Sequence, residues 1–173
     1  WLYENVKDEY VLNNSDIILD SGTAKIVSFI DHNYNLGSLD TEQIIEHFIN
    51  IIDNNAVLEK YADIIVKSKI DLAVWFDIPD PFKVRSNNEV VERRRNILDK
   101  DKEIELMDVS VLYTNKLYNI LKEKTDEKSA VDVLMPIVNG QWNKEQFDRF
   151  LSKLEFIPKN IAIGGISGSG YRI

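Results

Sequence analysis

Short apolar runs alternate with amphipathic stretches along this chain. Four of the runs are typical of buried strands, and they cover 16–20, 72–77, 133–138 and 160–163. The run at 72–77 is apolar almost throughout, as expected of a strand covered on both faces, and its Trp75 is expected in the core. Pro136 counts against a regular central strand in the third run, because proline cannot donate a ladder hydrogen bond.

Stretches with helical spacing lie between the runs. The clearest begins at Asp40, which can cap a helix reciprocally with Gln43 and is followed by apolar residues confined to one face. The same periodicity predicts a helix over 57–69 with Leu58, Tyr61, Ala62 and Ile65 turned inward. Further helices are expected over 89–98, over 109–124, and after Asn143, which can act as a cap. A loop is expected over 82–88.

This alternation of strands and helices predicts an α/β fold with parallel strands and right-handed crossovers. Two architectures fit: a section of a (β/α) barrel and a doubly wound sheet. Four strands cannot close an eight-stranded barrel, and the chain begins with Trp1 rather than Met. We therefore expect residues 1–173 to form one partial domain, a section of a (β/α)8 TIM-type barrel.

Composition and charge narrow the classes of function. The 173 residues are 44% hydrophobic, enough to fill a core, and 29 acidic against 21 basic residues give a net charge of −8. The overall charge therefore does not favour nucleic acid. The chain has no Cys, and its two histidines, His32 and His47, are expected at the surface, so no multi-ligand metal site is expected within it.

The chain also shows no sign of a membrane or secretory segment. No apolar run approaches about 18 residues, and no signal peptide is recognisable. We expect a cytoplasmic protein with no membrane partner.

The residues that follow the strands are the candidates for chemistry. Asp20 ends the first run, Asp77 the second, Asn139-Gly140 follow the third and Gly164-Gly165 the fourth. Parallel strands bring their carboxyl ends to one edge, where such folds carry their sites. Two carboxylates, an amide and exposed glycine backbone suit a flat polar heterocycle such as a guanine-like base. Each residue taken singly also fits a turn or a helix cap.

These residues also resemble a known family. Asp20-Ser21-Gly22, Phe76-Asp77, Ile137-Val138-Asn139-Gly140 and Ala162-Ile163-Gly164-Gly165-Ile166 occur in the order seen in tRNA-guanine (queuine) transglycosylases, which include related deazapurine enzymes that modify DNA. The resemblance covers about residues 15–170. Its most specific part is the last pair of motifs together with the helix between them.

The resemblance implies a TIM-type barrel that exchanges guanine in nucleic acid, tRNA or DNA, for a free 7-deazaguanine base at C1′. In that chemistry one Asp is the nucleophile and a second moves a proton. Asp20 would be the proton-transfer residue, Asp77 would accept N–H bonds from the base, and Asn139 would bond its edge. The backbone at Gly165 and Ile166 would meet the base carbonyl, with Gly140 and Gly164 completing the site. The family pairs subunits, so a dimer is expected.

The sequence departs from the family pattern at several positions. Thr23-Ala24-Lys25 stand where the family has Gly-Phe-Gln, and Asn139 stands where it has Gln. The family's nucleophilic Asp and its zinc site of three Cys and one His lie beyond the glycine motif, whereas this chain ends at Ile173. We expect this segment to be inactive by itself, to hold no metal, and to belong to a divergent branch, with DNA modification favoured.

Two other classes of function fit the same residues. A non-catalytic barrel could hold nucleic acid or a catalytic partner, since the altered residues after Gly22 suit a degenerate copy. An unrelated barrel enzyme could instead use Asp20 and Asp77 as an acid and base pair, for example on a glycoside.

Overall fold

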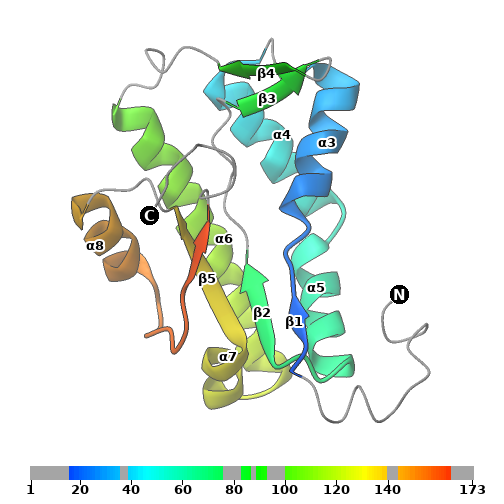
Figure 1. The fold of residues 1–173 in the computed structure, drawn as a ribbon. Coiled ribbons are helices and arrows are strands. Elements are labelled where there is room, and N and C mark those ends of the chain that lie inside the picture. Colours follow the sequence, from blue (N-terminus) through cyan, green and yellow to red (C-terminus); the bar gives the residue numbers. More distant parts are fainter. Residues whose placement is uncertain are drawn as a thin grey trace.

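The computed structural model describes residues 16–35, 39–75, 83–86, 89–92, 100–139 and 144–164. Its centre is a curled sheet of four parallel strands, β1 (Ile18–Leu19), β2 (Leu72–Trp75), β5 (Leu134–Asn139) and β6 (Ala162–Gly164). The four predicted strands are therefore confirmed within the described residues, and Figure 1 shows them side by side.

The order of the strands in the sheet follows their order in the chain, β1-β2-β5-β6. A doubly wound sheet needs a reversal of strand order at its centre. The described strands contain no such reversal, and their curled sheet is compatible with a partial α/β barrel. An α/β fold with a curled parallel sheet is confirmed.

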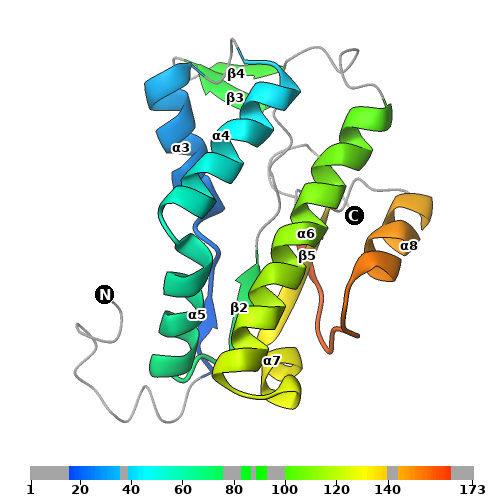
Figure 2. The same cartoon turned by 180° about the vertical axis from the view of Figure 1, so that it is seen from behind.

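Helices cover one face of this sheet. They are α4 (Thr41–Asn54), α5 (Val57–Lys67), α6 (Lys100–Lys124) and α7 (Glu127–Val133), with α8 (Lys144–Lys153) beside β5 and β6. Figure 2 shows α5 and α6 in front of the strands, with α4 above them and α7 at their lower end, and Figure 1 shows the sheet from its other side.

Register explains which side chains meet the helices. Leu19, Ala73 and Leu134 lie in register across three strands and so point to the same face. Ala73 and Leu134 are fully buried in the main core with residues of α4 to α7. On the alternate positions Ile18 is 59% exposed, so the second face of the sheet offers apolar surface at its β1 edge.

The two helices predicted most clearly form as expected. The Asp40 carboxylate accepts the Gln43 amide at 2.9 Å, and the Gln43 side chain accepts the Asp40 amide at 3.0 Å, so the capping box at α4 is complete. In α5 all four residues predicted to point inward are buried.

Other helix predictions need correction. The helix expected over 89–98 is wrong at its start, because Lys83–Ser86 (β3) and Glu89–Glu92 (β4) form an antiparallel hairpin. This also replaces most of the loop expected over 82–88. The β-branched pair Val90-Val91 favours a strand, and in the hairpin Val91 pairs with Val84. The helix expected from 109 starts at Lys100, and α3 (Thr23–Tyr34) and α7 were not predicted.

Pro136 lies in a strand with neighbours on both sides, which the sequence disfavoured. Pro136 is in register with Trp75 of β2. Alternate residues of a parallel strand address alternate neighbours, and proline has no N–H, so the bonds to β2 must run through residues 135 and 137. The Pro136 nitrogen then faces the β6 side, where pairing begins only at Ile137 and Ala162. No ladder bond is lost.

Candidate functional site at the carboxyl edge

The strand ends bring several predicted site residues to one edge of the sheet. Asp20 directly follows β1 and is exposed, and Asn139 and Gly164, the last residues of β5 and β6, lie in register. The structure therefore places these three positions at one edge of the sheet. The predicted site residues Asp77, Gly140, Gly165 and Ile166 lie outside the described residues.

Strand spacing sets the scale of this edge. Neighbouring strands lie about 4.8 Å apart, so the three steps from β1 to β6 span roughly 14 Å along the sheet. The three strands β2, β5 and β6 span roughly 10 Å. A planar base with hydrogen bonds on both sides fits that width, and Asp20 lies one strand further along the edge.

A tight turn sets the place of Asp20. Gly22 has φ +73°, a conformation that L side chains rarely adopt, and its carbonyl accepts the amides of Lys25 at 2.9 Å and of Ile26 at 3.4 Å. The chain thus turns from β1 into α3 within three residues. An Asp just before a helix start also interacts favourably with the helix dipole, so stabilisation of α3 is a structural explanation for an Asp at position 20.

The departure from the family pattern falls at the start of α3. Residues 23–25 form its first turn, and Lys25 is exposed. Figures 1 and 2 show α3 and the β3–β4 hairpin at the end of the molecule toward which the strands point. These insertions after β1 and β2 occupy the connections that line the site in parallel α/β folds.

Tyr61 is a residue of this edge that sequence reasoning placed only in the core. Its hydroxyl on α5 lies 2.9 Å from the carbonyl oxygen of Val74 and 3.1 Å from that of Leu19, and it donates its proton to this pair. Burial, and then the charge of Asp20, raise the pKa of Tyr61 well above its ordinary value. The hydroxyl therefore stays protonated and remains a donor.

The two histidines lie apart from this edge's predicted residues. His32 is exposed, as expected. His47 is half-buried rather than exposed, because its ring stacks on Tyr34 with a centroid distance of 4.0 Å and an interplanar angle of 19°. This stack joins α3 to α4.

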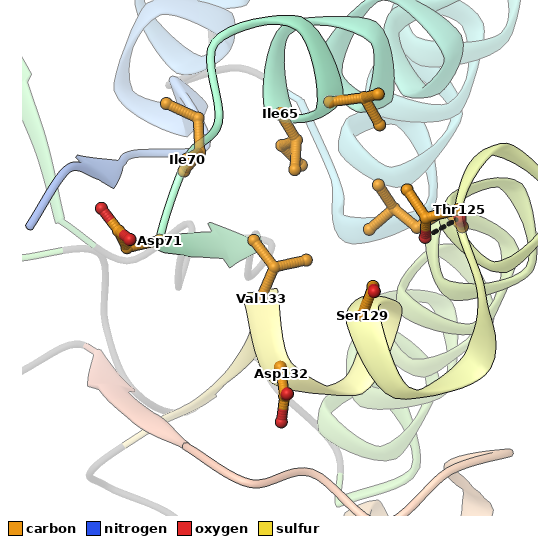
Figure 3. Close-up of a pocket in the computed structure, with 9 residues that line it drawn as sticks. Ile65, Ile70, Asp71, Thr125, Ser129, Asp132 and Val133 are labelled. Carbon is orange, nitrogen blue, oxygen red and sulfur yellow. Dashed lines mark hydrogen bonds between the residues drawn. The ribbon is translucent and has the colours of Figure 1, made fainter.

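A cavity of about 310 Å³ lies at the opposite, amino end of the sheet (Figure 3). Its polar residues serve the fold: the Asp71 carboxylate accepts the Ile17 amide at 2.8 Å, Asp132 pairs with Lys159 at 3.1 Å, and the Thr125 hydroxyl donates to the Leu121 carbonyl at 2.7 Å. No predicted site residue lines it. We therefore place the candidate site at the carboxyl edge.

Metal and membrane features were searched within the described residues. They hold no group of three or more His, Asp or Glu side chains that could bind a metal ion. None of their helices combines the length and the apolar character needed to cross a membrane.

Comparisons with protein-family models, with curated proteins and with solved structures find no match to this chain.

Proposed function

We propose that this chain is the base-recognition part of a guanine-exchanging transglycosylase, built on a (β/α)8 TIM-type barrel of which the described strands form about half. The observation that carries the proposal is the placement of Asp20, Asn139 and Gly164 at one carboxyl edge of parallel strands in chain order. This is the edge at which barrel enzymes hold their substrates.

The donors and acceptors of a guanine-type base match these residues. Such a base presents N–H donors and a carbonyl oxygen along one edge. The Asp77 carboxylate accepts the N–H groups, and the Asn139 amide can donate and accept. The backbone at Gly165 and Ile166 donates to the carbonyl oxygen, and Gly140 and Gly164 allow the close approach that this requires.

Asp20 takes the proton-transfer role in this scheme. Base exchange needs a group that protonates the leaving base and removes a proton from the incoming one. A carboxylate one strand away from the base-binding row can do both. The nucleophile that attacks C1′ and the zinc ligands are not among the residues of this chain that resemble the family.

The partners follow from the reaction. The substrates are a guanine nucleotide within nucleic acid and a free 7-deazaguanine base, and the changed residues 23–25 favour DNA over tRNA. Two copies of the protein can also pair as a dimer.

A base-exchange assay on the intact protein tests the proposal. Radiolabelled guanine is offered with tRNA and, in parallel, with duplex DNA, and we expect label to enter one of them. The Asp77→Asn variant loses a charge-assisted hydrogen bond of about 1.5–3 kcal/mol, a loss of roughly 10–150-fold in kcat/KM.

The matched control is Asp71→Asn. It makes the same chemical change next to the same strand but at its amino end, where Asn can still accept the Ile17 amide. We expect it to exchange guanine at the wild-type rate. Label in neither polymer would refute the proposal and favour the non-catalytic barrel.

A further inference from the structure

The bridge made by Tyr61 lies at the point where β1 leaves the sheet. β1 and β2 are paired only through Ile18–Leu72 and Leu19–Ala73. The Leu72 amide donates to the Ile17 carbonyl at 3.2 Å, and alternate residues of a parallel strand face the same neighbour. Val74 therefore presents its carbonyl toward β1 as well, beyond the last pair.

The Tyr61 hydroxyl donates where the next bond between the strands would lie. It is 2.9 Å from the Val74 oxygen and 3.1 Å from the Leu19 oxygen, so one side chain from a helix joins the carboxyl ends of both strands. Leu19 is the residue before Asp20. The contact thus acts on the backbone that carries Asp20.

The ring of Tyr61 has little freedom to move. The residue is 7% exposed, and its ring contacts that of Trp75 at a centroid distance of 4.9 Å. Trp75, the last residue of β2, is itself 1% exposed. Packing therefore fixes the hydroxyl from the β2 side.

β1 depends on this bridge more than β2 does. β1 has two residues and lies at the edge of the described sheet, whereas β2 is also paired with β5 at three positions. Loss of the bridge would release the end of β1 while leaving β2, β5 and β6 in place.

We propose that Tyr61 is a positioning residue of the candidate site, whose hydroxyl clamps the carboxyl ends of β1 and β2 and so fixes where Asp20 stands relative to the bound base. The role in catalysis rests on the proposed function, while the clamp itself does not. Tyr61 touches no substrate and acts through the backbone of Leu19.

The test compares Tyr61→Phe with Tyr113→Phe in the intact protein. Tyr113 is 1% exposed and its hydroxyl donates to the Asp53 carboxylate at 2.8 Å, so the control removes a buried tyrosine hydroxyl that joins α6 to α4. Tyr61→Phe removes the hydroxyl shared between two carbonyl oxygens, Tyr113→Phe removes the hydroxyl bonded to Asp53, and both variants keep the aromatic ring. Unfolding in urea monitors the global stability of each.

Amide hydrogen exchange measures the clamp without reference to activity. A lost hydrogen bond of about 1.4 kcal/mol corresponds to a tenfold change, so we expect exchange at the ladder amides between β1 and β2, where Leu19 pairs with Ala73, to quicken about tenfold in Tyr61→Phe. Tyr113→Phe should leave these amides unchanged relative to its global stability. Unchanged exchange in Tyr61→Phe would overturn the clamp, whatever the protein catalyses.

Kinetics measure the catalytic role. We expect Tyr61→Phe to lower kcat about tenfold or more while KM for the base stays within about twofold, because only the proton-transfer residue is displaced. If the role of Tyr61 were merely structural, kcat would not fall selectively while KM stays nearly unchanged. Quickened hydrogen exchange together with a wild-type kcat in Tyr61→Phe would overturn the positioning role. A wild-type protein that neither binds nor exchanges the base would refute the proposed function, and hydrogen exchange alone would then decide whether the clamp exists.

Discussion

Replacement of Gly22 by alanine measures the turn that presents Asp20. Gly22 has φ +73°, and a Cβ built on it would meet nothing within 4 Å. The cost of alanine is therefore purely one of backbone conformation. An L residue in this region costs about 1–2 kcal/mol, and alanine recovers about 0.4–1 kcal/mol by restricting the unfolded chain. The net loss in unfolding free energy is about 1 kcal/mol.

The assay is urea unfolding of the wild type, Gly22→Ala and Gly22→Asn. For a chain of this size 1 kcal/mol corresponds to a fall in Tm of about 2–4 °C, and the m-value should stay constant because the buried area does not change. Asparagine tolerates the left-handed region better, so it should lose less than alanine. A Gly22→Ala variant as stable as the wild type would refute the assigned turn.

Two further predictions concern the helices that hold the sheet. Asp40→Ala removes the cap of α4 and should cost about 1 kcal/mol of unfolding free energy, whereas Asp40→Asn keeps a side-chain acceptor and should cost a few tenths; equal losses in the two variants would argue against the capping box. Asp108 on α6 pairs with two cations on α8, Lys153 at 2.5 Å and Arg149 at 3.1 Å. Burial raises the pKa of Asp108, but the two cations lower it further, so the pKa lies below its ordinary value. Because the folded-state pKa is the lower one, this contribution is present above the unfolded-state pKa of about 3.9 and is lost as the pH falls through the folded-state value. Because the side chains are partly exposed, the ion pairs contribute about 1 kcal/mol to the free energy of unfolding. Asp108→Asn should therefore be less stable than the wild type by that amount at pH 7 and nearly as stable at a pH of about 2. A difference in stability that persists in acid would contradict the pairing.

The elements that the sequence predicted well are those with one apolar face or one continuous apolar run. α4 has a complete capping box, and α5 buries Leu58, Tyr61, Ala62 and Ile65 on one face. The four strands are recognisable in the sequence as short apolar runs between polar segments. Their common edge follows from parallel pairing alone, which is why Asp20, Asn139 and Gly164 could be placed together.

The elements that the sequence missed have apolar residues on more than one face or short alternating patterns. α6 packs Leu106, Tyr113 and Leu117 into the main core but Met107 and Val111 into a second cluster with α8. Because α6 buries two faces, its sequence lacks a single apolar stripe, and the first turns of α6 are not predicted by helical periodicity. In α3 Ile30 is fully buried while Phe29 beside it is 52% exposed, which weakens the amphipathic pattern.

Tyr61 shows the limit of pattern reading at the site itself. Helical periodicity predicts that Tyr61 points inward, and it does. Its hydroxyl, however, bonds carbonyls 42 and 13 residues away in the sequence, where two strands diverge. Such a contact depends on the packing of α5 on the sheet, which no local spacing encodes.

Equilibrium binding of free bases to the intact protein tests the proposed function most directly. Guanine and adenine are titrated in parallel by calorimetry. Adenine lacks the N–H donors and the carbonyl that the Asp77 carboxylate and the glycine backbone address, and each unpaired buried group costs about 1–3 kcal/mol. We expect guanine to bind at least about a hundredfold more tightly than adenine. Equal affinity for the two bases, or no binding of guanine, would contradict a guanine-recognition site at this edge.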